Sequence, residues 1–143
     1  MNDRNSTILR RAHAEEMFAH ARACLPEECC GLLGGRKGEA RSVYRLRNIA
    51  RDARIAYEAA PEELFAAQRE MRVRGEELLG IYHSHPRSAD PAPSATDVRL
   101  AFYPSAVYFI IGFTDEGECA LRAFRVSEGQ GTWERVRVSV ADE

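Results

Sequence analysis

The sequence lacks any hydrophobic run long enough to cross a membrane. Its longest apolar stretch, residues 106–113, is interrupted by a glycine, whereas a membrane-spanning helix needs about 20 apolar residues. The first residues are polar, and no apolar segment typical of a secretory signal follows them. We therefore expect no transmembrane helix, no membrane partner and a cytoplasmic location.

The sequence also lacks an excess of charge of either sign. Twenty Lys and Arg residues against 22 Asp and Glu give a formal net charge of −2 at pH 7. Such a chain has no basic surplus with which to hold a polyanion, so we expect no nucleic-acid partner. Gly and Pro number only 10 and 6, and hydrophobic residues make up 45%, which excludes a collagen-like or disordered chain.

Cysteine is scarce, and its spacing is typical of neither a disulfide framework nor a zinc finger. Cys24, Cys29, Cys30 and Cys119 contain no Cys-x-x-Cys pair, and two adjacent cysteines do not easily bridge each other. We expect reduced thiols that pack as small hydrophobic side chains.

The pattern of apolar residues predicts helices and strands in mixed order over a chain of 143 residues, the length of one domain. Spacings of three and four predict an amphipathic helix over 11–25, ended by Pro26. Pro61, followed by two acids, predicts a second helix that ends at Gly75. The predicted strands are 29–33, 42–49, 78–82, 107–113, 119–126 and 133–140. The fold class is therefore α/β, with a mixed sheet and helices on its faces, and the glycines at 34–35 predict a turn after the first strand.

Two histidines directly follow the apolar run at 78–82. His83 and His85 are two residues apart, and the two-residue period of a strand places both imidazoles on one face. Asp97 lies beyond a proline-rich loop, and we expect it in the first turn of a short third helix that begins at Ser94. Two imidazole nitrogens and one carboxylate oxygen, with a fourth position open, are typical of a catalytic zinc site.

Each of these features has a purely structural alternative. A lone His-x-His is more often a surface feature, and Ser94 with Asp97 resembles a capping box at the start of a helix. The coincidence of both with a stiff loop favours the metal, because a cap does not require histidines upstream. Ser94 can also cap the helix and offer its hydroxyl to the site. His13 and His20, on the polar part of the first helix, are expected to be solvated.

A metal-bound water needs a base that accepts its proton and passes it to a leaving group. Glu28 directly precedes the apolar strand at 29–33, where partial burial raises the pKa of a carboxyl group. We therefore predict Glu28 as this general acid and base. The alternative is that Glu27 and Glu28 form a solvated acidic pair.

Together these residues resemble the pattern of a known family. The three segments that carry the resemblance are Glu28-x-Cys30-Gly31, His83-Ser84-His85-Pro86 and Ser94-x-x-Asp97. Over nearly its whole length the chain resembles the JAMM (MPN-plus) zinc metalloproteases of the short bacterial type. The resemblance implies a cytidine-deaminase-like fold, with a curved mixed sheet and flanking helices. It also implies a single domain over 1–143, with its core at about 8–126 and a C-terminal strand at about 133–140.

The resemblance assigns roles to the candidate residues. It implies that His83, His85 and Asp97 hold one Zn²⁺ per chain, that Glu28 is the general acid and base, and that Ser94 stabilises the oxyanion. The implied activity is that of a zinc-dependent metallopeptidase or isopeptidase. Its substrate would be the C-terminal Gly-Gly tail of a ubiquitin-like or sulfur-carrier protein, because residues without side chains let an extended backbone lie close to the metal. The sequence leaves open whether the protein forms a homodimer.

One departure from the family pattern and two other functions stay open. Eight residues separate His85 from Ser94, one more than is usual, so Asp90 is a competing third ligand. Cys30 with a histidine base would make a cysteine hydrolase, although this cysteine lies within an apolar run. A metal-free MPN-type scaffold would bind partners without turnover, although here every residue of the motif is present.

Overall fold

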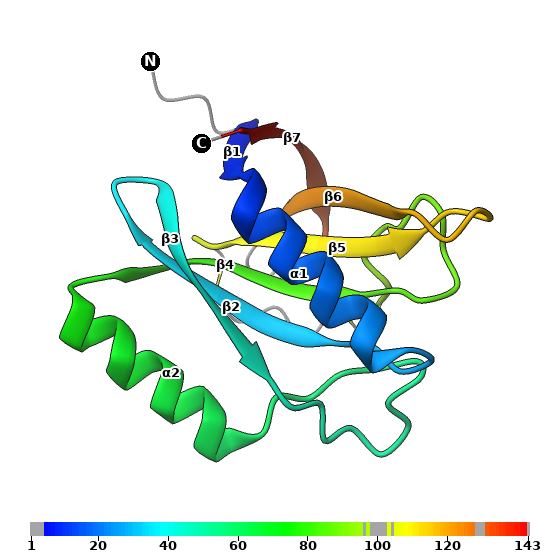
Figure 1. Cartoon of the computed structure of the whole chain (residues 1–143), viewed down its shortest axis with the longest axis horizontal. Coiled ribbons are helices and arrows are strands. Elements are labelled where there is room, and N and C mark those ends of the chain that lie inside the picture. Colours follow the sequence, from blue (N-terminus) through cyan, green and yellow to red (C-terminus); the bar gives the residue numbers. More distant parts are fainter. Residues whose placement is uncertain (1–4, 96, 98–102, 104, 128–130, 143) are drawn as a thin grey trace.

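A seven-stranded mixed sheet with a helix on each face forms the part of the chain that the structure describes (Figure 1). The computed structural model describes residues 5–95, 97, 103, 105–127 and 131–142. The strands are β1 (Ser6–Arg10), β2 (Cys30–Arg36), β3 (Glu39–Leu46), β4 (Glu77–Ser84), β5 (Val107–Phe113), β6 (Cys119–Val126) and β7 (Trp133–Ala141), and their order in the sheet is β1-β7-β6-β5-β4-β2-β3. β1 is parallel to β7 and β4 to β5, and the other pairs are antiparallel.

The helices α1 (Arg11–Cys24) and α2 (Pro61–Arg74) cover opposite faces of the sheet. In β2, Leu33 packs with Met17 of α1, whereas the preceding residue, Leu32, packs with Met71 of α2. Neighbouring residues of a strand point to opposite faces, so a central strand buried on both sides is apolar throughout. Neither helix is long and apolar enough to span a membrane, nor is any other helix among the described residues.

The sheet is strongly curved. β1 and β3 stand at opposite ends of the strand order, yet Arg10 of β1 and Glu39 of β3 form an ion pair across the gap. This curvature brings the two ends of the sheet together beside the first turn of α1, and it confirms the expected curved mixed sheet.

Three details of the predicted strands are wrong. The strand expected at 42–49 runs instead over Glu39–Leu46, so Asn48 lies outside it. The strand β1 was not expected, and it pairs with β7 at the far end of the chain. The turn expected at 34–35 does not form there, because β2 continues through both glycines with a register shift. A Cβ on Gly35 would lie 2.0 Å from the backbone oxygen of Glu39. A glycine is therefore needed where β2 and β3 approach each other this closely. The turn follows at Lys37 and Gly38, whose φ angles are 53° and 77°.

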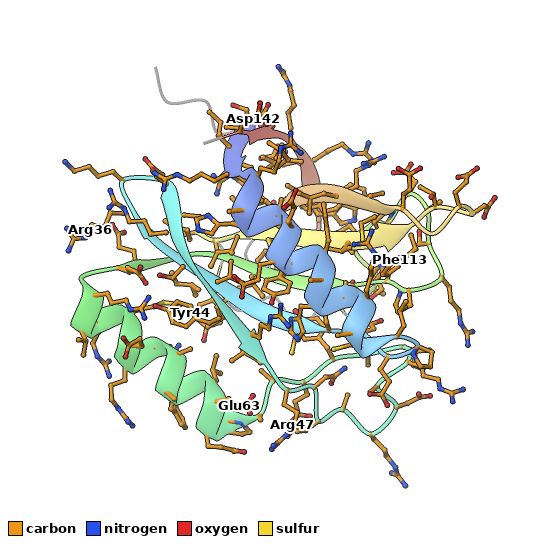
Figure 2. All side chains as sticks on the ribbon, viewed as in Figure 1. Arg36, Tyr44, Arg47, Glu63, Phe113 and Asp142 are labelled. Atoms are coloured by element: carbon orange, nitrogen blue, oxygen red, sulfur yellow. The ribbon has the colours of Figure 1, made fainter. Side chains whose placement is uncertain are left out.

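A half-buried carboxylate directly before β4 connects the end of α2 to the sheet. Glu76 accepts hydrogen bonds of 2.6 Å from the hydroxyls of both Ser42 and Tyr44 on β3, and Figure 2 shows Tyr44 between β3 and α2. Arg36 donates to the carbonyls of Arg74 and Gly75 at the C-terminal end of α2. These contacts position the N-terminal end of β4, the strand whose other end carries the histidines.

The expectation that His20 is solvated is wrong. Its residue is 7% exposed, and its Nδ1 is hydrogen-bonded to the hydroxyl of Tyr82 at 2.7 Å. The curved sheet wraps around α1 and buries part of the face that the helical pattern marks as polar. Burial, with a smaller contribution from the Arg45 charge, lowers the pKa of His20 to about 4.

We predict that His20 makes the protein less stable as pH falls. The folded-state pKa lies below the ordinary value, so the unfolded chain takes up the proton first, and stability falls between pH 7 and about 4. We expect the free energy of unfolding of the parent protein to fall by about 2 kcal/mol over this pH range. His20→Gln should not show this loss, because glutamine does not titrate. Urea unfolding of both proteins at pH 7, 5.5 and 4.5 measures the difference. A difference that stays constant with pH contradicts the prediction.

Candidate metal centre

The C-terminal end of β4 presents two imidazoles on the α2 side of the sheet. Ile81 packs into the core beneath α2, and the period of two places His83 on the same face. The His83 ring is stacked on Tyr57, with ring centroids 4.4 Å apart and an interplanar angle of 25°. His85 follows the strand, and its backbone N–H donates to the carbonyl of Ile111 on β5 at 2.8 Å. Both histidines are thus attached to the centre of the sheet.

Asp97 meets the two imidazoles at one point. The Nε2 atoms of His83 and His85 are 3.1 Å apart, and Oδ2 of Asp97 lies 3.2 Å from the first and 3.0 Å from the second. The ligand atoms of a tetrahedral zinc ion, with bonds of about 2.0–2.1 Å, are roughly 3.3 Å apart. The structure therefore brings the three predicted ligands to the spacing that one small divalent ion requires.

A capping box aims the Asp97 carboxylate. The backbone N–H of Asp97 donates to Oγ of Ser94 at 3.0 Å, and the N–H of Ser94 donates to Oδ2 of Asp97 at 2.9 Å. That oxygen is the one that faces both histidines, so the capping role and the ligand role are compatible. Of the expected third helix, Ala95 and Asp97 are helical, and residues 96 and 98–102 lie outside the described residues.

Asp90, the competing third ligand, points elsewhere. Its carboxylate is 2.9 Å from the guanidinium of Arg122 and 3.8 Å from that of Arg135, and its side chain is 66% exposed. The extra residue of the loop is therefore accommodated on the surface, and Asp97 keeps its place beside the histidines.

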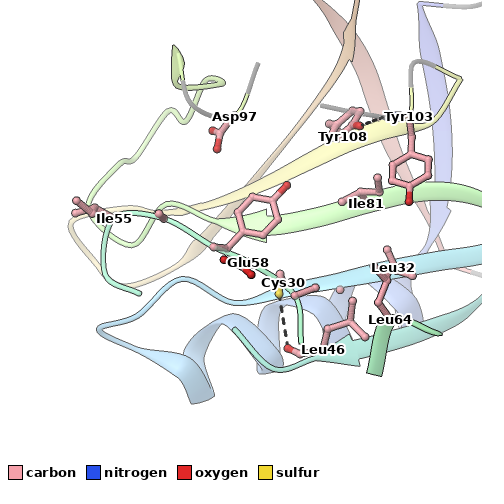
Figure 3. Close-up of a pocket in the computed structure, with 14 residues that line it drawn as sticks. Cys30, Leu32, Leu46, Ile55, Glu58, Leu64, Ile81, Asp97, Tyr103 and Tyr108 are labelled. Atoms are coloured by element: carbon pink, nitrogen blue, oxygen red, sulfur yellow. Dashed lines mark hydrogen bonds between the residues drawn. The ribbon is translucent and has the colours of Figure 1, made fainter. Parts of the chain in front are cut away.

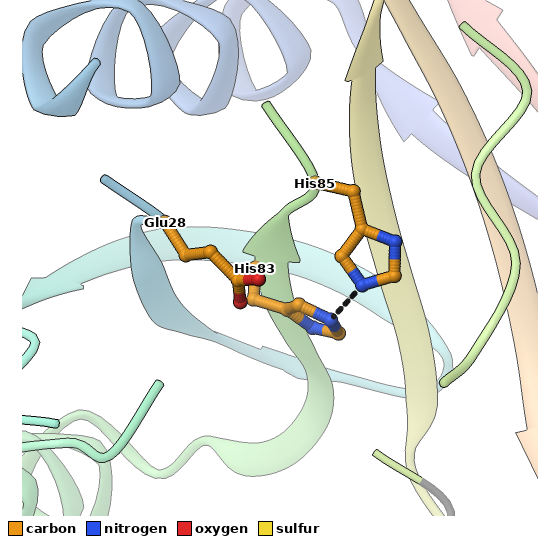
Figure 4. A group of neighbouring side chains, drawn as sticks. All are labelled: Glu28, His83 and His85. Atoms are coloured by element: carbon orange, nitrogen blue, oxygen red, sulfur yellow. Dashed lines mark hydrogen bonds between the residues drawn. The ribbon is translucent and has the colours of Figure 1, made fainter. Parts of the chain in front are cut away.

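Glu28 is buried next to the imidazoles but is not hydrogen-bonded to them. The residue is 5% exposed, so a solvated pair with Glu27 is excluded. A carboxylate oxygen of Glu28 lies within 4.8 Å of ring nitrogens of both His83 and His85, a set that could itself hold an ion, and Figure 4 shows the carboxylate beside His83. Oε1 has no hydrogen-bond partner among the described residues. Asp97 touches both rings directly, so Glu28 is better placed to bind a water at the ion than to be its third ligand.

The electrostatics of the cluster suit a cation and a base. Burial lowers the pKa of His83, although the hydrogen bond to Asp97 opposes this, so the ring is neutral near pH 7, which is the form of imidazole that binds a metal. Burial acts to raise the pKa of Asp97, but hydrogen bonds to His83 and His85 outweigh it and hold that pKa well below its ordinary range. Burial raises the pKa of Glu28 to about 7, with His85 acting to lower it and Asp97 to raise it. A carboxylate of this kind can both accept and return a proton near neutral pH.

The set of donor atoms also fits a metal by its chemistry. Two imidazole nitrogens and a carboxylate oxygen are ligands that zinc accepts, and three protein ligands with an open position are typical of catalytic zinc. Three lone-pair atoms converge without a Lys or Arg side chain among their hydrogen-bond partners in the described part of the chain. A cation at their centre would satisfy all three.

The comparison with known families decides the classification. The family described as prokaryotic homologs of the JAB domain matches residues 10–127. The chain belongs to this family. The match confirms the resemblance that the three motif segments carry.

Two named proteins and one solved structure are similar to this chain over most of its length. The desampylase of Haloferax volcanii is 40% identical over 103 residues, which cover 67% of this chain and 73% of the relative. The CysO-cysteine peptidase of Mycobacterium tuberculosis is 33% identical over 132 residues, covering 92% and 90%. A solution structure of a protein from Desulfitobacterium hafniense has a TM-score of 0.83 and 35% identity, with 96% and 94% coverage.

Cys30 of this JAB-family chain is poorly suited to be a nucleophile. It lies opposite His83 across the β2–β4 pair, but its thiol faces the carbonyl of Leu46 at 3.8 Å and the residue is 1% exposed. Burial raises the pKa of Cys30 to about 12, whereas a nucleophilic cysteine needs an accessible thiolate. The structure therefore favours metal chemistry over a cysteine hydrolase.

We predict that iodoacetamide does not reach Cys30 in the folded protein. Cys24 and Cys119 are half-buried, whereas Cys29 and Cys30 are buried, so the first pair should be alkylated before the second. Peptide mass spectrometry after native and denaturing alkylation gives the order. Rapid labelling of Cys30 in the native state, with loss of activity, would support the cysteine hydrolase instead.

An apolar cavity that no sequence motif indicates adjoins Asp97. It encloses about 260 Å³ between the segment 47–60 and the strands beneath α2, and Figure 3 shows Asp97 at one end and Leu32 and Leu64 toward the other. Tyr57 lines this cavity and stacks on His83, a role that was not predicted. No motif marks Tyr57, because its position follows from the path of a loop.

Proposed function

We propose that the protein is a zinc-dependent metallopeptidase that hydrolyses an amide or isopeptide bond at the C-terminal Gly-Gly tail of a ubiquitin-like or sulfur-carrier protein. The observation that carries the proposal is the convergence of His83, His85 and Asp97 at 3.0–3.2 Å beside the buried Glu28. The names of the two relatives, a desampylase and a CysO-cysteine peptidase, support the same class of substrate.

The residues divide the chemistry among themselves. A zinc ion held by His83, His85 and Asp97 would supply Lewis acidity for the scissile carbonyl and lower the pKa of a bound water to about 7. Glu28 accepts the proton of the attacking water as the oxygen–carbon bond forms. Glu28 then returns that proton to the amine as the carbon–nitrogen bond breaks, which balances the hydrolysis. Ser94 accepts the capping bond through its oxygen, so its hydroxyl proton is free to donate to the oxyanion.

The surroundings of the site suit an extended tail. The cavity beside Asp97 is lined mostly by apolar side chains, including those of Ile55, Leu64, Tyr103 and Tyr108. A side chain upstream of the Gly-Gly pair would fill this cavity, while the glycines let the backbone approach the histidines closely.

We predict that Asp97 is needed for metal binding and that its capping partner is not. Both Asp97→Ala and Ser94→Ala remove a hydrogen bond of the cap, but only the first removes a ligand. We expect about one zinc per chain in the parent and in Ser94→Ala, and an affinity more than about 100-fold lower in Asp97→Ala. Elemental analysis after dialysis, with a competing chelator, measures this. A parent protein that binds no zinc would support the metal-free scaffold.

We predict that Glu28→Gln keeps its zinc and loses turnover. Glutamine has nearly the same size as glutamate but cannot accept the proton, so kcat should fall by about 10²- to 10⁴-fold. The assay incubates the zinc-loaded protein with a conjugate of a ubiquitin-like protein whose C-terminus is Gly-Gly, and identifies the released tail by mass spectrometry. Unchanged turnover would remove Glu28 from the mechanism, and cleavage away from the Gly-Gly terminus would contradict the proposed substrate.

A further inference from the structure

The segment 47–60, which connects β3 to α2, holds the backbone of Glu28 on both sides. The N–H of Glu28 donates to the carbonyl of Ala53 at 2.7 Å, and the carbonyl of Glu28 accepts from Nδ2 of Asn48 at 3.0 Å. Glu28 precedes β2, which begins at Cys30, so the sheet does not fix it. The two bonds to segment 47–60 take the place of the strand ladder.

The side chain of Glu28 has little else to position it. Its Oε1 atom is buried and has no hydrogen-bond partner among the residues that the structure describes. A base must stay within hydrogen-bond reach of the proton that it takes, and a displacement of about 1 Å can lower a rate 100-fold. The carboxylate is therefore placed through its backbone.

Asn48 is the residue that gives segment 47–60 its shape. Its Nδ2 donates to the carbonyls of Glu28 and Ala56, both at 3.0 Å, and its Oδ1 accepts from the N–H groups of Ala50 at 2.9 Å and Glu58 at 3.0 Å. All the hydrogen-bonding positions of an amide side chain are thus used. The residue after Ala56 is Tyr57, which stacks on His83, so one side chain organises a loop that touches both the base and a predicted ligand.

We propose that Asn48 is a positioning residue for Glu28, acting through the hydrogen bond from its Nδ2 to the Glu28 carbonyl. The inference rests on the proposed function insofar as Glu28 is the base. The connection between β3 and α2 lies outside the three motif segments, and we assign to it the positioning of that base. Asn48 itself is not placed to touch the substrate or the reacting atoms.

Two variants of Asn48 separate this role from simple loop stability. Asn48→Ala removes all four bonds, whereas Asn48→Asp keeps an acceptor for Ala50 and Glu58 but cannot donate to Glu28. Asp52→Ala is the matched control, because Asp52 lies in the same loop and, among the described residues, its side chain bonds only the N–H of Arg54, at 3.4 Å.

We expect both Asn48 variants to lower kcat by about 10- to 100-fold, with KM and zinc content within about twofold of the parent. In a Glu28→Gln background, Asn48→Ala should cause no further loss, because a residue that acts only through Glu28 has nothing left to position. Asp52→Ala should match the parent. An equal fractional loss in both backgrounds, or a loss explained by KM or zinc content, overturns the proposal.

Hydrogen exchange of single amides tests the same tether without any activity. In both Asn48 variants the Glu28 N–H should exchange about tenfold faster than in the parent, while the N–H of Ser84, which bonds Cys29 in the adjoining ladder at 3.2 Å, should be unchanged. Unaltered protection at Glu28 overturns the proposal even if turnover falls. If the parent hydrolyses no conjugate, the proposed function fails, and the exchange data still decide whether Asn48 holds Glu28.

Discussion

The crowding of three lone-pair atoms at the end of β4 is the constraint on which the rest of the site depends. Two imidazole nitrogens and one carboxylate oxygen lie 3.0–3.2 Å from one another, an arrangement that a divalent cation bound by all three would stabilise. A second contact positions each of the three residues. The ring of Tyr57 stacks on His83, the β5 backbone accepts a hydrogen bond from the backbone of His85, and Ser94 donates to the Asp97 carboxylate.

The fold supplies this convergence through its central strands. β4 is paired with β2 on one side and β5 on the other, so the two histidines lie at the end of a central strand. Asp97, in the connection to β5, lies over the same end of the sheet. The segment between β3 and α2 closes the other side, where it contributes Tyr57, holds the backbone of Glu28 and lines the apolar cavity. The predicted ligands come from the end of β4 and from the connection to β5, and the proposed base comes from the connection between α1 and β2. Together with the segment between β3 and α2, these parts meet at one end of the sheet.

The parts of the fold and site that could be predicted from the sequence depend on patterns within short segments. The two-residue period of a strand placed His83 and His85 on one face, and Ser94 with Asp97 marked a helix start, while proline and glycine bounded α2. The rest depends on contacts between distant segments. β1 is short and pairs with a strand more than 100 residues away, and His20 is buried by sheet curvature. The alternating pattern wrongly placed Asn48 in the strand expected at 42–49, whereas this residue lies in the loop after β3. Tyr57 lies in the same loop, and no pattern marks it.

The central claim is that His83, His85 and Asp97 share one metal ion and that Glu28 faces its open position. The most direct measurement is a crystal structure of the zinc-loaded protein with anomalous data collected on both sides of the zinc edge. The account predicts one anomalous peak at about 2.0–2.2 Å from Nε2 of both histidines and from Oδ2 of Asp97, with a water between the peak and Glu28. A peak bound by Glu28 in place of Asp97, or no peak at this site, would contradict it.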